Sequence, residues 1–561
     1  MEEPSMELLQ SQGVRIAIEG CGHGTLNAIY ESIKTSCTKR GWDGVDLLII
    51  GGDFQAVRNP SDLNAMSVPA KYRDLGDFHE YYSGIRKAPY LTVFIAGNHE
   101  ASNHLWELFY GGWAAPNIYY MGAANVLRLG PIRIAGLSGI WKGRDYQKTH
   151  YERLPFNGDD VKSFYHVREI DVRRLLLMRS QVDVGLSHDW PRGVEWNGNT
   201  AQLFRHKPFF EQESKDGTLG SPAAMYVMDR LRPLHWFSAH LHCKFVAFKK
   251  HKPVLELEED GATNAPEPVA TTEPAIVSNV DEIDLDMDSD GDSENSPTAA
   301  SESPKPTEQN VQGPVDPNIR AQLPAFFAAP STSHSTSRQR KIPGQPVPKT
   351  ISNTETRFLA LDKCLPGRHF LQLVDMTPFD KTQLDNCPPT TTGTSGSRFK
   401  LQYDPEWLAI NRVFAKQIKI GDPGAENPVD LGEEVYIPLI EAEKKWVQTN
   451  IVNKNLLDVP ENFEITAPIH VAGEPEVVDD LPVEYTNPQT SKFCELLDIP
   501  NQWDASDEER ADRQRAGPRP SDFKFSGGGR GGNRNGRGGG RGSWNGNRNR
   551  GGGHGRGRGR R

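Results

Sequence analysis

Five short segments of the chain carry His, Asp, Asn and Cys side chains of the kind that bind metal ions. Each follows an apolar, often β-branched run, and the segments are Cys21-Gly22-His23, Gly52-Asp53, Gly97-Asn98-His99-Glu100, Ser187-His188-Asp189 and His240-Leu241-His242. Any one of these segments alone has a purely structural explanation, because a single histidine in a turn or an aspartate that caps a helix is common. Five in succession, each at a predicted strand end, indicate one metal site built from several strands.

The elements that must position these ligands are apolar runs separated by turn signals and helical stretches. The runs cover residues 14–18, 45–50, 91–95, 132–137 and 182–186. Short β-branched runs alternating with helices are typical of α/β domains, so residues 14–250 are predicted to form one whose strand ends build a single cleft. His240 and His242, two apart on a segment predicted to be extended, should point the same way.

Composition limits how much of the chain can fold. Hydrophobic residues make up only 36%, and there are 53 Gly and 41 Pro in 561 residues. The net charge of −10 conceals an acidic middle and a basic C-terminus. We predict a disordered acidic Pro/Ser/Thr-rich linker at 251–353, a smaller folded domain at 354–500 and a disordered Arg/Gly-rich tail at 501–561.

Several classes of protein are disfavoured. The six cysteines are scattered without a compact disulfide framework, and the N-terminus lacks a basic region followed by an apolar core. No apolar run reaches the roughly 18 residues that a membrane span needs. We therefore expect a protein of a reducing intracellular compartment, without membrane association. Acids alternate before Gly291 as in a calcium loop, but Pro297 stands where the closing glutamate would fall, which favours a solvated acidic run.

Together, the ligand segments are similar to the calcineurin-like metallophosphoesterase pattern: Asp-x-His, Gly-Asp, Gly-Asn-His-Asp/Glu, a later His and Gly-His-x-His. Two positions depart from it, with Cys21 in place of Asp and Ala239 in place of Gly. Longer strings resemble the RNA lariat debranching enzyme family, which has Cys at that first position. They include Gly52-Asp53-Phe54-Gln55-Ala56-Val57-Arg58-Asn59, Ala101-Ser102-Asn103-His104 and Ser187-His188-Asp189-Trp190-Pro191. Residues 357–366 resemble that family's C-terminal domain.

The resemblance implies a two-sheet α/β/β/α metallophosphoesterase sandwich with a smaller C-terminal domain. It also implies two divalent ions (Fe²⁺, Zn²⁺ or Mn²⁺) that activate a hydroxide nucleophile. Their implied ligands are Cys21, His23, Asp53, Asn98, His188, His240 and His242, with Asp53 as the bridge. Whether Cys21 is itself a ligand stays open. His99, beside Asn98, would be the general acid that protonates the leaving oxygen.

The implied reaction is hydrolysis of the 2′–5′ phosphodiester at the branch point of excised intron lariat RNA, in the nucleus and near splicing-associated factors. A basic and aromatic segment falls at the family's lariat-recognition loop, and its candidate substrate-binding residues are Lys142, Arg144, Tyr146, Lys148, His166 and Arg168. An ordinary solvated connection is the alternative for that segment. For the whole protein, the alternatives are a general metallo-nuclease or protein phosphatase of the same superfamily, or a non-catalytic RNA-binding scaffold that relies on the tail.

Overall fold

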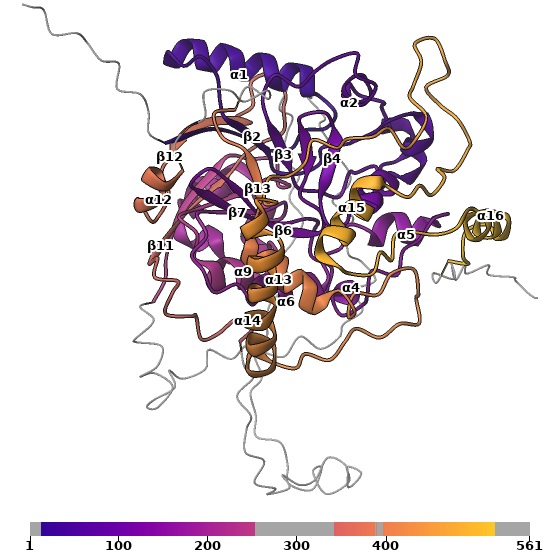
Figure 1. The fold of residues 1–561 in the computed structure, drawn as a ribbon. Coiled ribbons are helices and arrows are strands. Elements are labelled where there is room, and N and C mark those ends of the chain that lie inside the picture. The colour runs from indigo at the N-terminus through magenta and orange to yellow at the C-terminus, as the bar shows by residue number, and fades with distance from the viewer. Residues whose placement is uncertain (1–12, 253–341, 388, 390–396, 522–561) are drawn as a thin grey trace, which may run out of the picture. The chain divides into compact units, whose positions relative to one another are not determined.

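Two β-sheets share one hydrophobic core in the computed structural model, which describes residues 13–252, 342–387, 389 and 397–521 (Figure 1). The first sheet has the order β12 (Leu371–Met376), β1 (Val14–Glu19), β2 (Leu47–Ile50), β3 (Thr92–Phe94), β5 (Ile118–Tyr120), β4 (Gly112–Ala115). The second has the order β10 (Phe245–Lys250), β11 (Glu355–Ala360), β9 (His235–Ser238), β8 (Val184–Ser187), β7 (Ile132–Leu137), β6 (Ala124–Leu129), β13 (Leu401–Tyr403). The predicted strands of residues 14–250 are therefore present, divided between two sheets.

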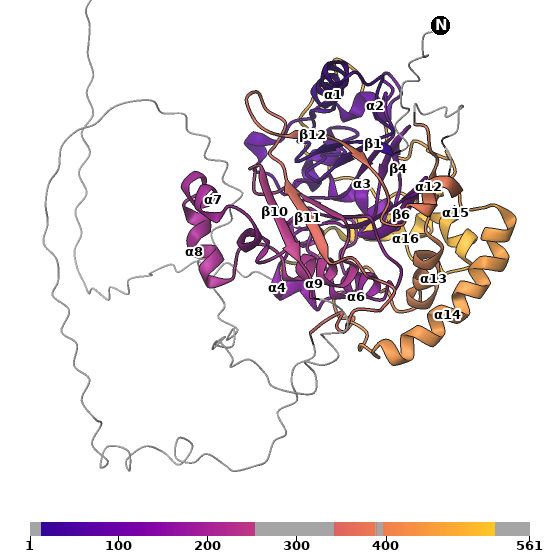
Figure 2. The same cartoon turned by 90° about the vertical axis from the view of Figure 1, so that its left-hand side faces the viewer.

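The described residues also form α-helices, several of which pack on the outer faces of the sheets. They are α1 (Leu26–Arg40), α2 (Phe78–Tyr82), α3 (Ser102–Glu107), α4 (Gly143–Tyr146), α5 (Gly158–Ser163), α6 (Glu169–Leu176), α7 (Thr200–His206), α8 (Phe209–Asp216), α9 (Pro222–Leu231), α12 (Thr382–Asn386), α13 (Pro405–Phe414), α14 (Glu433–Asn450), α15 (Pro488–Leu497) and α16 (Asp507–Ala516). Apolar residues of α1 pack on β2 and β3, whereas α6 and α9 lie together against the second sheet (Figure 2). This layering confirms the predicted α/β/β/α class. None of the helices described here has both the length and the hydropathy for crossing a bilayer.

The C-terminal region completes both sheets. β12 pairs antiparallel with β1, β11 pairs parallel with β9, and β13 pairs antiparallel with β6. Residues 354–500 thus contribute strands to the sandwich as well as the added helices α13 to α15. Local sequence could not reveal this, because strand partners are chosen by contacts between segments hundreds of residues apart.

The folded part extends beyond the predicted boundaries at both ends of the C-terminal region. Val347 and Ile351, at the end of the predicted linker, are buried, and α16 lies within the predicted tail. A capping box formed by Ser506 and Glu509 begins α16. The N-terminus, the calcium-loop candidate, most of the predicted linker and the tail from residue 522 lie outside the described residues.

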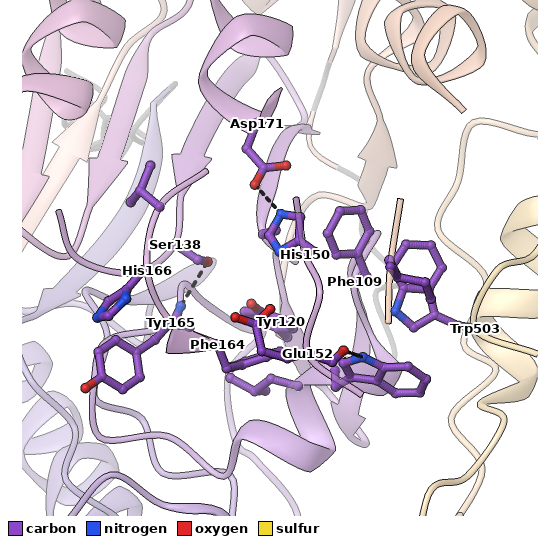
Figure 3. Close-up of a pocket in the computed structure, with 17 residues that line it drawn as sticks. Phe109, Tyr120, Ser138, His150, Glu152, Phe164, Tyr165, His166, Asp171 and Trp503 are labelled. Carbon is purple, nitrogen blue, oxygen red and sulfur yellow. Dashed lines mark hydrogen bonds and ion pairs between the residues drawn. The ribbon is translucent and has the colours of Figure 1, made fainter. Parts of the chain in front are cut away.

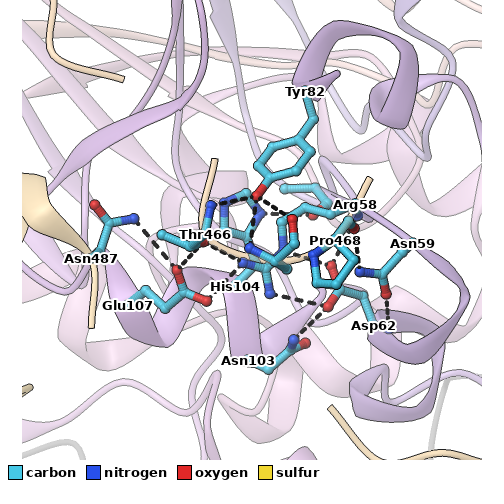
Figure 4. A network of polar contacts seen from close by, with 12 residues as sticks. Arg58, Asn59, Asp62, Tyr82, Asn103, His104, Glu107, Thr466, Pro468 and Asn487 are labelled. Atoms are coloured by element: carbon cyan, nitrogen blue, oxygen red, sulfur yellow. Dashed lines mark hydrogen bonds and ion pairs between the residues drawn. The ribbon is translucent and has the colours of Figure 1, made fainter. Parts of the chain in front are cut away.

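A buried polar network fastens the C-terminal region to the loop that follows Asp53 (Figure 4). Arg58 is fully buried; its guanidinium lies 2.9 Å from Asp62 and 2.7 Å from Glu107, and it donates to Thr466 Oγ1 at 3.0 Å. Tyr82 Oη accepts the backbone N–H of Thr466 at 2.8 Å. Removing one partner of such a buried ion pair typically costs about 3–5 kcal/mol, so this contact holds the loop firmly.

Candidate metal centre

Strand ends of both sheets bring the predicted ligands together. β1, β2 and β3 lead to Cys21 and His23, to Asp53 and to Asn98, while β8 and β9 lead to His188 and to His240 and His242. One ligand atom each from Cys21, His23, Asp53 and His242 lie within 4.8 Å of one another, and no other group of this kind was found among the described residues. These four residues form a candidate position for one metal ion.

Asp53 lies between two groups of histidines. Its Oδ2 is 3.7 Å from His23 Nε2, and its Oδ1 is 3.3 Å from His188 Nε2. The His188 ring lies 5.0 Å from that of His240, centroid to centroid. The two carboxylate oxygens therefore face opposite sides, as expected of a carboxylate that bridges two ions.

The hydrogen bond of His188 supports a cation at this place. Its Nδ1 lies 2.8 Å from the carbonyl oxygen of Gly51, which can only accept, so Nδ1 carries the proton. In the neutral imidazole Nε2 presents a lone pair to Asp53 Oδ1, and both side chains are buried. Two buried acceptors this close need a positive charge between them. A proton on Nε2 supplies it in the absence of metal, since burial, which lowers the pKa of His188, is outweighed by Asp53, which raises it, and a metal ion in the same place is what this donor set also fits.

Four of the predicted ligand residues have left-handed backbone conformations. The φ angles are 42° for His23, 47° for Asp53, 60° for His240 and 46° for His242. Such values are uncommon outside glycine and are enriched at functional sites. The prediction that His240 and His242 lie on an extended segment is wrong, because the chain turns immediately after β9.

Charges around Asp53 set the protonation of the centre. Burial raises the pKa of Asp53, but the nearby His188 and His99 outweigh it and bring that pKa well below its ordinary range. Burial, followed by Asp53 and Glu19, raises the pKa of the Cys21 thiol well above its usual value. Cys21 Sγ accepts the backbone N–H of His240 at 3.2 Å. Asp53 is therefore ionised at neutral pH, whereas the Cys21 thiol keeps its proton, so the carboxylate is the negative charge that attracts a cation.

Glu100 organises the centre, although sequence reasoning gave it no role. Its carboxylate accepts the backbone N–H groups of Phe54 and Gln55, both at 2.8 Å, and of Gly97 at 3.0 Å. Burial raises its pKa to about 7. It joins the loop that carries Asp53 to the loop that carries Asn98. Its place as the fourth residue of Gly97-Asn98-His99-Glu100 was the available signal.

The predicted substrate-binding segment divides into buried and exposed side chains. Arg168 and His166 are 0% and 3% exposed. Arg168 donates to the Asp145 carbonyl at 3.0 Å, and His166 Nδ1 lies 2.7 Å from Asp145 Oδ2. Their prediction as RNA contacts is not supported, because both are used to build the loop.

The remaining members of that segment are accessible. The side chains of Arg144 and Lys148 are 50% and 48% exposed, and both face Asp145, at 3.4 and 2.7 Å. Tyr146 packs on Trp141 with ring centroids 4.7 Å apart, and Lys142 is half-buried. Asp145 therefore positions the exposed basic side chains Arg144 and Lys148 above the buried His166 and Arg168.

A small pocket lies beneath this segment (Figure 3). Its volume is about 40 Å³, and its lining includes Ala96, Ser138, His150, Asp171 and Trp503. His150 Nε2 lies 2.7 Å from Asp171 Oδ2 within it. A space of this size holds roughly one water molecule and no nucleotide. It is therefore a packing feature between the segment and the C-terminal region.

Known proteins are similar to this chain over most of its length. The family profile of calcineurin-like phosphoesterases matches residues 14–244, and that of the lariat debranching enzyme C-terminal domain matches residues 353–502. The lariat debranching enzyme of Schizosaccharomyces pombe is 39% identical over 489 residues, which cover 87% of this chain and 96% of that protein. The human enzyme of that name is 36% identical over 486 residues (87% and 69%), and the Arabidopsis thaliana enzyme 34% over 497 residues (88% and 88%).

Proposed function

Because this chain belongs to the lariat debranching enzyme family of calcineurin-like phosphoesterases, and is thus a phosphodiester hydrolase, we propose that it opens the 2′–5′ bond at the branch point of excised intron lariat RNA. The placement of the Asp53 carboxylate between two histidine groups is the observation that supports this most. We propose on the same premise that the reaction takes place in the nucleus, near splicing-associated factors.

The superfamily uses divalent metal ions, and the residues here divide into two sets that fit them. One position has His23, Asp53 and His242 beside Cys21. The other is proposed to take Asp53 with Asn98, His188 and His240, of which His188 lies against Asp53 and His240 packs on His188. Imidazole with one carboxylate and a thiol favours Fe²⁺, Zn²⁺ or Mn²⁺ over Mg²⁺. When bound, such ions supply Lewis acidity and lower the pKa of water enough to make a nucleophile at neutral pH.

His99 is the proposed proton donor to the leaving oxygen. Its backbone N–H bonds to Asp53 Oδ1 at 2.9 Å, and its ring lies 5.5 Å from that of His23, centroid to centroid. It is half-buried at the edge of the centre. The leaving group of the proposed substrate is a ribose 2′-alkoxide, which needs a proton as the bond breaks.

The specificity for branched RNA is tested by comparing substrates of equal length and base composition. We expect the metal-loaded protein to cut the 2′–5′ bond of a branched RNA and to leave linear 3′–5′ RNA intact. Mass spectrometry of the products identifies the bond that is cut. Equal cleavage of both RNAs would favour a general nuclease, and faster turnover of a phosphoprotein would favour a phosphatase. Binding without turnover would favour a scaffold.

The Arg/Gly-rich stretch at 525–561 contains no acidic residue, and we propose that it adds electrostatic affinity for RNA. Its attachment point is fixed, because Arg519 bonds to Asp160 at 2.8 Å and Asn157 donates to the Arg519 carbonyl at 3.0 Å. Removing residues 522–561 should weaken RNA binding and flatten its salt dependence, while turnover at saturating RNA changes by less than about two-fold. A Gly/Ser stretch of equal length is the control, and lost turnover at saturation would contradict this role.

A further inference from the structure

A turn of the C-terminal region lies against the metal centre. It connects β11 to β12, and its residues Asp362 to Cys364 run beside Cys21. The Cys21 N–H donates to the Asp362 carbonyl at 3.4 Å, and the Cys364 N–H donates to the Cys21 carbonyl at 3.3 Å. These two bonds form a parallel bridge between Cys21 and Lys363.

The same turn also touches the loop that carries the last two histidines. The Leu361 N–H donates to the Ser238 carbonyl at 3.2 Å, two residues before His240. The turn is thus held between the Cys21 loop and the His240 to His242 loop. The turn approaches the Gly20 backbone so closely that only glycine fits there, since a Cβ on Gly20 would lie 2.1 Å from the Asp362 carbonyl oxygen.

Lys363 brings a positive charge to this edge of the centre. Its side chain is half-buried, and the Asp362 carboxylate beside it accepts the Lys363 backbone N–H at 2.8 Å and lies 3.6 Å from Arg368. Because the Lys363 backbone pairs with that of Cys21, the lysine stands at the Cys21 edge of the candidate centre.

The proposed substrate carries more than one phosphate near this point. A branch nucleotide bears phosphodiesters on both its 2′ and 3′ oxygens, whereas an interior linear nucleotide bears only the 3′ one. The ligand cluster around Asp53 serves the scissile 2′–5′ phosphate. A cation just outside that cluster suits the neighbouring phosphate, because an ammonium group acts as a compact point charge with three donors.

We infer that Lys363 binds the 3′–5′ phosphate of the branch nucleotide and so favours branched RNA over other 2′–5′-linked substrates. This inference rests on the proposed debranching function. It makes Lys363 a specificity-determining residue contributed by the C-terminal region, and it explains why the β11–β12 turn is built against the centre.

The test compares two substrates with the full-length, metal-loaded protein. One is a branched RNA with both arms, and the other is a 2′–5′-linked dinucleotide that lacks the 3′ arm. Lys363→Ala should lower kcat/KM for the branched RNA by about 10- to 100-fold, the range for losing one hydrogen bond to a charged group. Cleavage of the dinucleotide should change by less than about two-fold, and Lys363→Arg should restore most of the branched activity.

Further measurements separate this role from a structural one. Metal content of Lys363→Ala should equal that of the wild type, and Lys454→Ala, which removes an exposed lysine after α14, should leave both rates unchanged. Equal losses on both substrates, or loss of metal, would overturn the inference. The rates of the wild type test the proposed function independently of the variant. A wild type that cuts neither substrate would refute that function.

Discussion

Replacing Asp53 by Asn is expected to cause the largest loss of activity, with kcat on branched RNA falling about 10³-fold or more. The substitution keeps the shape and the oxygen that accepts the His99 N–H. It removes the negative charge between the His23 and His188 groups. A bridging carboxylate contributes several kcal/mol of charge stabilisation through its ions, and 1.36 kcal/mol corresponds to a factor of ten in rate.

Metal content should fall together with this rate. Plasma mass spectrometry of the purified variant is expected to show fewer ions per chain than the wild type, because both proposed positions share Asp53. Asp43→Asn is the matched control: Asp43 is 91% exposed, pairs only at the surface with Arg15, and should change neither quantity. Full metal content with full turnover in Asp53→Asn would show that Asp53 is no bridge.

His99→Ala is expected to have the second largest effect, a loss of about 10²- to 10⁴-fold in kcat, the range for removing a general acid. Metal content should be unchanged, because the backbone N–H that bonds to Asp53 remains in the variant. RNA affinity should also be retained, since the lost interaction matters only when the leaving oxygen gains charge.

An activated substrate shows whether the missing function is proton donation. A phosphodiester with a nitrophenolate leaving group departs without a proton, so His99→Ala should hydrolyse it within about ten-fold of the wild-type rate. His206→Ala removes an exposed histidine at the end of α7 and serves as the control. If the variant loses as much on the activated ester as on branched RNA, His99 positions the substrate or the metals and is not the acid.

The candidate site could be predicted from the sequence because strands and metal-binding residue types are both recognisable in short segments. Each apolar run from 14–18 to 182–186 corresponds to a strand, and the donors at the strand ends converge around Asp53. Period-two or continuous apolar runs report backbone conformation directly, and His, Asp and Cys are the residue types that ions require. The alternation of strands and helices indicated an α/β domain, whereas the two-sheet class came from the family resemblance.

The tertiary structure decided which residues are accessible and which segments meet. Arg168 and His166 read as RNA contacts in the sequence, yet packing buries them against Asp145. Glu100 gained a role only when three N–H groups from two loops converged on it.

The placement of Lys363 beside Cys21 likewise depends on pairing between β1 and β12, more than 300 residues apart in the chain. Composition and periodicity determine what a segment can form and which chemistry it carries. Burial and distance between remote segments arise from the summed packing of the whole fold, and no local pattern encodes them.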